Sequence, residues 1–207
     1  GVHDYRIMGG ADGPPAFRAY ERLQAAGELS LRMWMHIPGE RLDEAIALGL
    51  RTGMGDDYLR VGHVKLFSDG GQGARTAWML EPYEDTGHCG IPLTPMDQIA
   101  RAVERADRAG LSVAIHAIGD RANRELIGVF EETLSGEREA DTAPSVARHR
   151  IEHVQMIRPE DIARLAQLGV VASVQPIHCP DDIPMIEKSV GSRGRFAYPF
   201  RDMKEAG

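Results

Sequence analysis

Val64–Gly70 reads VKLFSDG, and two later stretches, VAIHAIGD (Val113–Asp120) and HRIEHV (His149–Val154), share its plan. In each, a short apolar run of strand-like residues delivers one potential metal ligand: Lys65, His116 and His153. Parallel barrels collect side chains from successive strands at their carboxyl-end face, where metal sites form. The three stretches therefore predict a parallel βα fold and indicate that the chain is part of an enzyme.

The rest of the chain alternates strand-like and helix-like segments. Strands are expected at residues 2–8, 30–37, 61–67, 112–118, 149–154 and 170–175, and amphipathic helices at 15–26, 41–50, 95–110, 121–134 and 159–168. A polar loop is expected over residues 135–147. This alternation favours a parallel sheet with helices outside it, and a closed barrel of this type needs eight such units. We predict an α/β fold, a partial TIM-type (β/α)8 barrel holding the second to seventh βα units in a single domain, residues 1–207.

Composition bounds the class of protein. The 207 residues are 43% hydrophobic and 27% charged, as in an ordinary soluble globular protein. The net charge of -7, without a block of Lys or Arg, argues against a nucleic-acid partner. No apolar run approaches the roughly 20 residues that cross a bilayer, so no membrane partner is expected. Two cysteines, Cys89 and Cys179, are too few for a disulfide framework and favour the reducing cytoplasm.

His116 and His153 follow apolar strands directly. Neutral imidazole is a good ligand for zinc-like ions, and two such histidines on successive strands favour a metal site over the alternative, core histidines hydrogen-bonded to backbone. A period of two along the strand puts Ile151 and His153 on one face and Glu152 on the other. Glu152 is therefore expected to support the site or the fold rather than to bind metal.

Lys65 is unusual because it lies inside a strand of Val, Leu and Phe. Burial disfavours its charge and lowers the amine pKa. A neutral amine can react with carbon dioxide to form a carbamate, whose two oxygens can bridge two metal ions. The alternative is an ammonium paired with Asp69 or another carboxylate, and the residues alone favour that alternative.

Four segments in order resemble the amidohydrolase superfamily. They are KLFSDGGQGARTA (Lys65–Ala77), HAIGDRAN (His116–Asn123), RIEHVQ (Arg150–Gln155) and SVQPIH (Ser173–His178). The nearest match is its amidohydrolase family 3 branch, which contains N-substituted formamide deformylase-like and YtcJ-like proteins. The resemblance extends over essentially the whole chain.

The resemblance implies a distorted (β/α)8 barrel attached to a small β-sandwich. One or two divalent metals, zinc above all, would activate water to hydrolyse carbon-nitrogen bonds other than peptide bonds in a small amide-type substrate. Lys65 would be the carboxylated bridging residue, and His116 and His153 would bind the second metal. Four further residues match positions for substrate contact or support of the ligands: Asp69, Arg75, Gln175 and His178. For Asp69 and Arg75 a structural ion pair is the alternative.

Two parts of the family pattern are missing. The His-x-His pair of the first barrel strand and the Asp of the eighth, which would serve as catalytic base, are not in this chain, and His3 and Asp4 do not replace them. We therefore expect an internal piece of a longer protein, without the first and eighth strands or the β-sandwich, and inactive by itself. Its unpaired strand edges would favour a homo-oligomer.

Two other functions stay open. The same fold can perform deamination, because loops outside the motifs decide the reaction. The alternative outside the enzymes is a non-catalytic structural or binding fragment. It would have Lys65 salt-bridged and both histidines hydrogen-bonded. In either case we expect His63, which shares a face with Lys65, to belong to the core.

Overall fold

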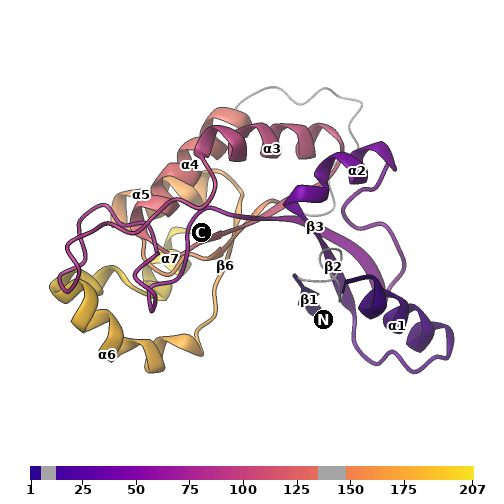
Figure 1. Ribbon diagram of the computed structural model, residues 1–207, viewed down its shortest axis with the longest axis horizontal. Helices are drawn as coiled ribbons and strands as arrows, with labels where there is room; N and C mark the ends of the chain where they lie inside the picture. Colours follow the sequence, from indigo (N-terminus) through magenta and orange to yellow (C-terminus); the bar gives the residue numbers. More distant parts are fainter. Residues whose placement is uncertain (6–12, 135–147) are drawn as a thin grey trace. The chain divides into compact units, whose positions relative to one another are not determined.

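The computed structural model describes residues 1–5, 13–134 and 148–207 (Figure 1). Six strands form one sheet in chain order, and the pairs β1 with β2, β2 with β3 and β5 with β6 are parallel. The strands are β1 Val2–Asp4, β2 Met33–Pro38, β3 Leu59–Phe67, β4 Val113–Ala117, β5 Arg150–His153 and β6 Val171–Ser173. The prediction of a partial (β/α) barrel is confirmed. The expected loop at 135–147 and the end of the first expected strand lie outside the described residues.

Helices separate the strands as expected. They are α1 Gly13–Ala25, α2 Leu42–Ala47, α3 Met96–Arg108, α4 Asp120–Leu134, α5 Pro159–Gln167, α6 His178–Val190 and α7 Phe200–Ala206, with 3-10 turns η1 Gly39–Arg41 and η2 Gly191–Phe196. The helix expected at 41–50 is shorter, because η1 takes its start and the chain turns at Gly49 with a positive φ of 70°. None of the described helices is long and apolar enough to span a bilayer.

The described residues group into two compact units. The first holds residues 1–66, 101–114 and 148–149, and the second holds residues 67–100, 115–134 and 150–207. In the first unit α1 packs on the sheet, where Phe17 and Tyr20 cover the buried side chains of Met33, Met35 and Leu59 (Figure 1). This contact fixes the outer face of β2 and β3 and turns the alternate residues to the opposite face.

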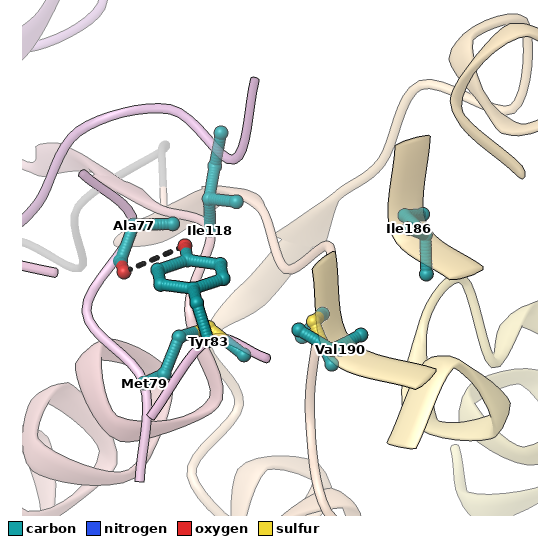
Figure 2. Close-up of a cluster of buried hydrophobic side chains, with 7 residues drawn as sticks. Ala77, Met79, Tyr83, Ile118, Ile186 and Val190 are labelled. Atoms are coloured by element: carbon teal, nitrogen blue, oxygen red, sulfur yellow. Dashed lines mark hydrogen bonds between the residues drawn. The ribbon is translucent and has the colours of Figure 1, made fainter. Parts of the chain in front are cut away.

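The second unit has its own core, drawn in Figure 2. Tyr83 is 1% exposed among Met79, Ile118, Ile186 and Val190, and its hydroxyl donates a hydrogen bond of 2.9 Å to the carbonyl of Ala77. Burial raises the pKa of the Tyr83 hydroxyl. Because Ile186 and Val190 belong to α6, this cluster holds that helix against the loop that follows β3. The core thereby fixes the segment that carries the first family motif.

Candidate metal centre

His116 and His153 meet in the second unit at the ends of their strands. His116 lies on β4 and His153 is the last residue of β5. Their ring centroids are 4.6 Å apart, with the ring planes at 70° to each other, and both side chains are partly buried. Phe67, the last residue of β3, lies 5.4 Å from the His116 ring. The structure thus brings together two of the three residues predicted to bind metal.

The hydrogen bond of His116 fixes its tautomer. Its Nε2 lies 3.1 Å from the carbonyl oxygen of Gly70 and 3.6 Å from Oδ1 of Asp69. A carbonyl oxygen only accepts, so Nε2 carries the proton and Nδ1 carries the ring's lone pair. Metal-binding histidines are oriented in the same way, by donating the other ring N–H to a carbonyl or carboxylate.

His153 is fixed in the opposite tautomer. Its Nδ1 lies 2.7 Å from Oε1 of Gln175, while the amide nitrogen of Gln175 donates a 2.9 Å bond to the carbonyl of Ser173. The second bond orients the amide, so Oε1 faces the ring and accepts from Nδ1–H, and Nε2 of His153 carries the lone pair. The backbone turns sharply here, with φ of 79° at His153 and 44° at Val154. Such conformations cost energy in residues other than Gly and collect at functional sites.

Asp69 supports this region through backbone hydrogen bonds. Its side chain is fully buried and accepts N–H bonds from Trp78 at 2.8 Å, Ile118 at 3.0 Å and Gly119 at 2.8 Å. Burial raises the pKa of Asp69 to about 6, against the lowering effect of these three donors. At Gly119 a Cβ would lie 2.0 Å from the carbonyl oxygen of Trp78, so only glycine allows this close approach.

Three other residues were named from the sequence, and each has its own surroundings. Arg75 forms an ion pair of 2.7 Å with Asp85, so it has a structural partner other than Asp69. His178 is exposed at the first residue of α6. Lys65 belongs to the first unit, where it is 8% exposed and its Nζ lies 3.3 Å from the carbonyl oxygen of Leu66.

Sequence reasoning missed a polar network in the second unit. Gln155 donates to Oε1 of Gln72 at 3.1 Å and to Oδ2 of Asp182 at 3.3 Å, and the Tyr198 hydroxyl donates to the same Asp182 oxygen. Gln72 also lies 3.4 Å from the hydroxyl of Ser189. Gln72 and Gln155 both lie inside the quoted motifs, which was the available signal, but their partners come from α6 and the segment after η2.

The donor chemistry of the pair fits a zinc-like ion. Two neutral imidazoles, each anchored through one nitrogen to an acceptor oxygen, present the other nitrogen as a ligand. The curvature of the backbone at His153 also holds that ring near His116. His116 and His153 could therefore hold a metal, with Gly70 and Gln175 orienting them.

Known proteins match the chain over nearly its whole length. The sequence model of a family described as "Amidohydrolase family" matches residues 5–207. Protein LONG AFTER FAR-RED 3 from Arabidopsis thaliana is 33% identical over 84% of the chain, and the putative amidohydrolase YtcJ from Bacillus subtilis is 28% identical over 92%. The chain covers only 29% and 34% of these two relatives, about a third of their length.

Two solved structures are also similar to this chain. A crystal structure described as an uncharacterized metal-dependent hydrolase from Pyrococcus furiosus superposes with a TM-score of 0.83 at 31% identity, covering 99% of this chain and 40% of that protein. A second such hydrolase, from Pyrococcus horikoshii, also has a TM-score of 0.83, at 33% identity, with 99% and 39% covered.

Proposed function

Because this chain belongs to the amidohydrolase family, we propose that it is part of a metal-dependent hydrolase that cleaves carbon-nitrogen bonds other than peptide bonds. The substrates would be small amides or N-substituted formamides. The observation that carries the proposal is the pair of His116 and His153, whose rings lie 4.6 Å apart in opposite, fixed tautomers. The metal-dependent hydrolases among the similar structures support it.

His116 through Nδ1 and His153 through Nε2 would hold a divalent metal, most simply zinc. Such an ion, when bound, supplies water activation and polarisation of the substrate carbonyl. Lys65, as a carbamate, would be the ligand shared between two metals. Its burial supports this assignment, because a buried amine loses its proton more easily.

The surrounding residues position these ligands. The Gly70 carbonyl and Gln175 hold the rings in place, and Asp69 joins the loop after β3 to the end of β4. His178, exposed at the start of α6, would contact substrate or support the ligands. Residues 1–207 lack the His-x-His pair and the catalytic Asp of the family pattern, so this piece by itself would be inactive. The two free cysteines support a cytoplasmic location.

The test is a substrate screen with the full-length natural protein, after its zinc has been measured by elemental analysis. The panel holds N-substituted formamides, simple and cyclic amides, and amino-heterocycles as deamination substrates. We expect turnover of an amide or formamide, lost by more than about 100-fold in His116→Asn and His153→Asn, because even outer partners of metal ligands are worth 10–100-fold. His88→Ala, which changes an exposed histidine, is the matched control.

Other outcomes decide between the alternatives. Turnover confined to amino-heterocycles, with ammonia released, would replace amide hydrolysis by deamination. A full-length protein without metal, inactive on the whole panel, would favour a non-catalytic binding protein. A carbamate on Lys65 is tested separately by ¹³C NMR after growth with labelled bicarbonate. Sedimentation of residues 1–207 tests the expected homo-oligomer.

A further inference from the structure

Three histidines of the first unit gather on one face of its sheet. They are His3 on β1, His36 on β2 and His63 on β3, and one ring nitrogen from each lies within 4.8 Å of the others. His36 is fully buried, His63 is 3% exposed and His3 is half-buried. Ring centroids of His36 lie 5.2 Å from those of both His3 and His63. Buried imidazoles at this density need partners, because uncompensated polar burial is costly.

The strand register builds this cluster. Met35 pairs with Val61 and Ile37 with Val64, so β3 carries one more residue than β2 between these pairs. The extra residue falls at Gly62 and His63, opposite His36, and is a β-bulge of the kind that redirects a side chain. A Cβ on Gly62 would lie 3.1 Å from Nδ1 of His36, so glycine leaves room for this ring.

Backbone groups orient two of the rings. Nε2 of His63 lies 3.2 Å from the carbonyl oxygen of Arg148, so Nε2 donates and Nδ1 carries the lone pair. Nδ1 of His36 lies 2.9 Å from the backbone nitrogen of His63 and 3.3 Å from its carbonyl oxygen. It can therefore either accept the N–H or donate to the carbonyl. Nε2 of His36 lies 3.0 Å from Nδ1 of His3.

We propose that His3, His36 and His63 form a second metal site, for a divalent transition-metal ion of the zinc type. Zinc–nitrogen bonds of 2.0–2.1 Å in tetrahedral geometry separate two nitrogen ligands by about 3.3 Å, close to the observed 3.0 Å between His3 and His36. Imidazole suits Zn, Cu, Fe and Ni. Three protein ligands leave a fourth position for water.

Metal binding needs a proton shift within His36, which gives up the hydrogen bond from the His63 N–H and gains one to the His63 carbonyl. In the metal-free chain Nδ1 of His36 accepts from the His63 N–H, and Nε2 donates to His3. With the proton on Nδ1, that nitrogen donates to the His63 carbonyl and Nε2 becomes a ligand. Nε2 of His36, Nδ1 of His3 and Nδ1 of His63 then supply the three lone pairs, and no proton is lost from the ring.

This site uses residues other than the strand-end histidines, and it does not depend on the proposed hydrolase activity. Lys65 follows His63 by two residues on the same strand, which is about 7 Å along β3. A metal-free alternative exists, in which the three rings form only a hydrogen-bonded stack. The two differ in whether the cluster retains a metal at stoichiometric amounts.

The test is cobalt binding to residues 1–207, which contain no His-x-His pair, with His116→Asn and His153→Asn disabling the strand-end pair. We expect this protein to bind Co²⁺ with a visible absorption spectrum of four-coordinate geometry. Adding His3→Phe should weaken binding by more than about 100-fold, since even outer partners of metal ligands are worth 10–100-fold. His3→Phe is chosen because His3 is half-buried on β1 at the edge of the sheet, and His36→Gln is the second variant. His88→Ala, at an exposed histidine, is the matched control.

Two results would overturn the site. One is a correctly folded double variant, by circular dichroism, that binds no Co²⁺, Zn²⁺ or Ni²⁺. The other is binding that survives both His3→Phe and His36→Gln. Because the double variant lacks the strand-end pair, failure of the proposed hydrolase activity would not change the interpretation of either result.

Discussion

The two units use the same side chain in two different settings. In the first unit the histidines lie within the strands and stack on each other and on aromatic rings, with Tyr5 4.2 Å from His36 and Trp34 5.9 Å from His3. In the second unit His116 and His153 meet edge to face, and each is anchored to an oxygen that follows a strand. One cluster is held by strand pairing and the other by loops.

This difference decides what each cluster can tolerate. Strand register places His36 opposite His63, so changes in the loops of the second unit should leave that cluster unchanged. The positions of His116 and His153 depend on Gly70 and Gln175, and Asp69 holds the backbone that follows β4. Loops carry function on many scaffolds because they vary without disturbing the core. The predictions below separate the two kinds of support.

Asp69→Ala should have the largest effect on stability. It leaves the N–H groups of Trp78, Ile118 and Gly119 without their acceptor, and each such loss in a buried setting costs about 1–3 kcal/mol. We expect the free energy of unfolding in urea to fall by about 3–5 kcal/mol. The matched control is Asp202→Ala, an exposed carboxylate on α7, for which a change within about 0.5 kcal/mol is expected. A loss from Asp69→Ala as small as that of the control would show that the loop does not depend on this carboxylate.

Gln175→Ala tests the support of the pair His116 and His153 alone. It removes the acceptor that holds Nδ1–H of His153, and outer partners of this kind are worth 10–100-fold in metal affinity. We expect zinc affinity of the full-length protein to fall by that factor, with stability nearly unchanged because Gln175 is only partly buried. Gln175→Glu, which keeps an acceptor oxygen, should restore most of the affinity. Equal affinity in all three proteins would remove Gln175 from the support of His153.

Sequence periodicity was enough for the order of the strands and helices. Apolar runs of strand length followed by amphipathic segments predicted the six strands of the described residues, and the pattern is clearest in β3 and β4, which are mostly buried. It was not enough for α6. Pro184 lies inside that helix and has no N–H to donate to the carbonyl of Pro180, so its sequence does not have a helical signature.

The register between neighbouring strands was the other feature that the sequence did not predict. Spacing of two correctly groups His63 with Lys65, but nothing in the spacing places His36 and His3 beside His63, because that follows from pairing between strands and from the bulge at Gly62. The partners of Asp69 were equally hidden, since they are backbone N–H groups about nine and fifty residues away. Side-chain identity named the candidate ligands, and tertiary contacts supplied the groups that orient their rings.

Gly62→Ala tests how strand register supports the cluster of His3, His36 and His63. The added Cβ would lie 3.0 Å from the Met35 carbonyl oxygen and 3.1 Å from Nδ1 of His36, so the ring or the bulge must shift. Overpacking of this kind costs about 1–3 kcal/mol, and we expect a loss near the lower end because the contacts are only slightly too short. Gly128→Ala, where nothing lies within 4 Å of the new Cβ, is the matched control and should be neutral or stabilising. Unchanged Co²⁺ binding in Gly62→Ala would show that metal binding does not depend on the exact position of the His36 ring.

Tyr83→Phe is the smallest and most local change. It keeps the buried ring in the core of the second unit but removes the donor to the Ala77 carbonyl, and we expect a loss of about 1 kcal/mol in urea unfolding. Tyr58→Phe, at an exposed tyrosine, should cost almost nothing. The two variants share the same chemistry, so their difference isolates the buried hydrogen bond. Tyr83 belongs to the second unit, so Co²⁺ binding by His3, His36 and His63 should not change. A parallel loss of that binding would mean that the two clusters are coupled through the sheet, which is the opposite of independent support by loops and by register.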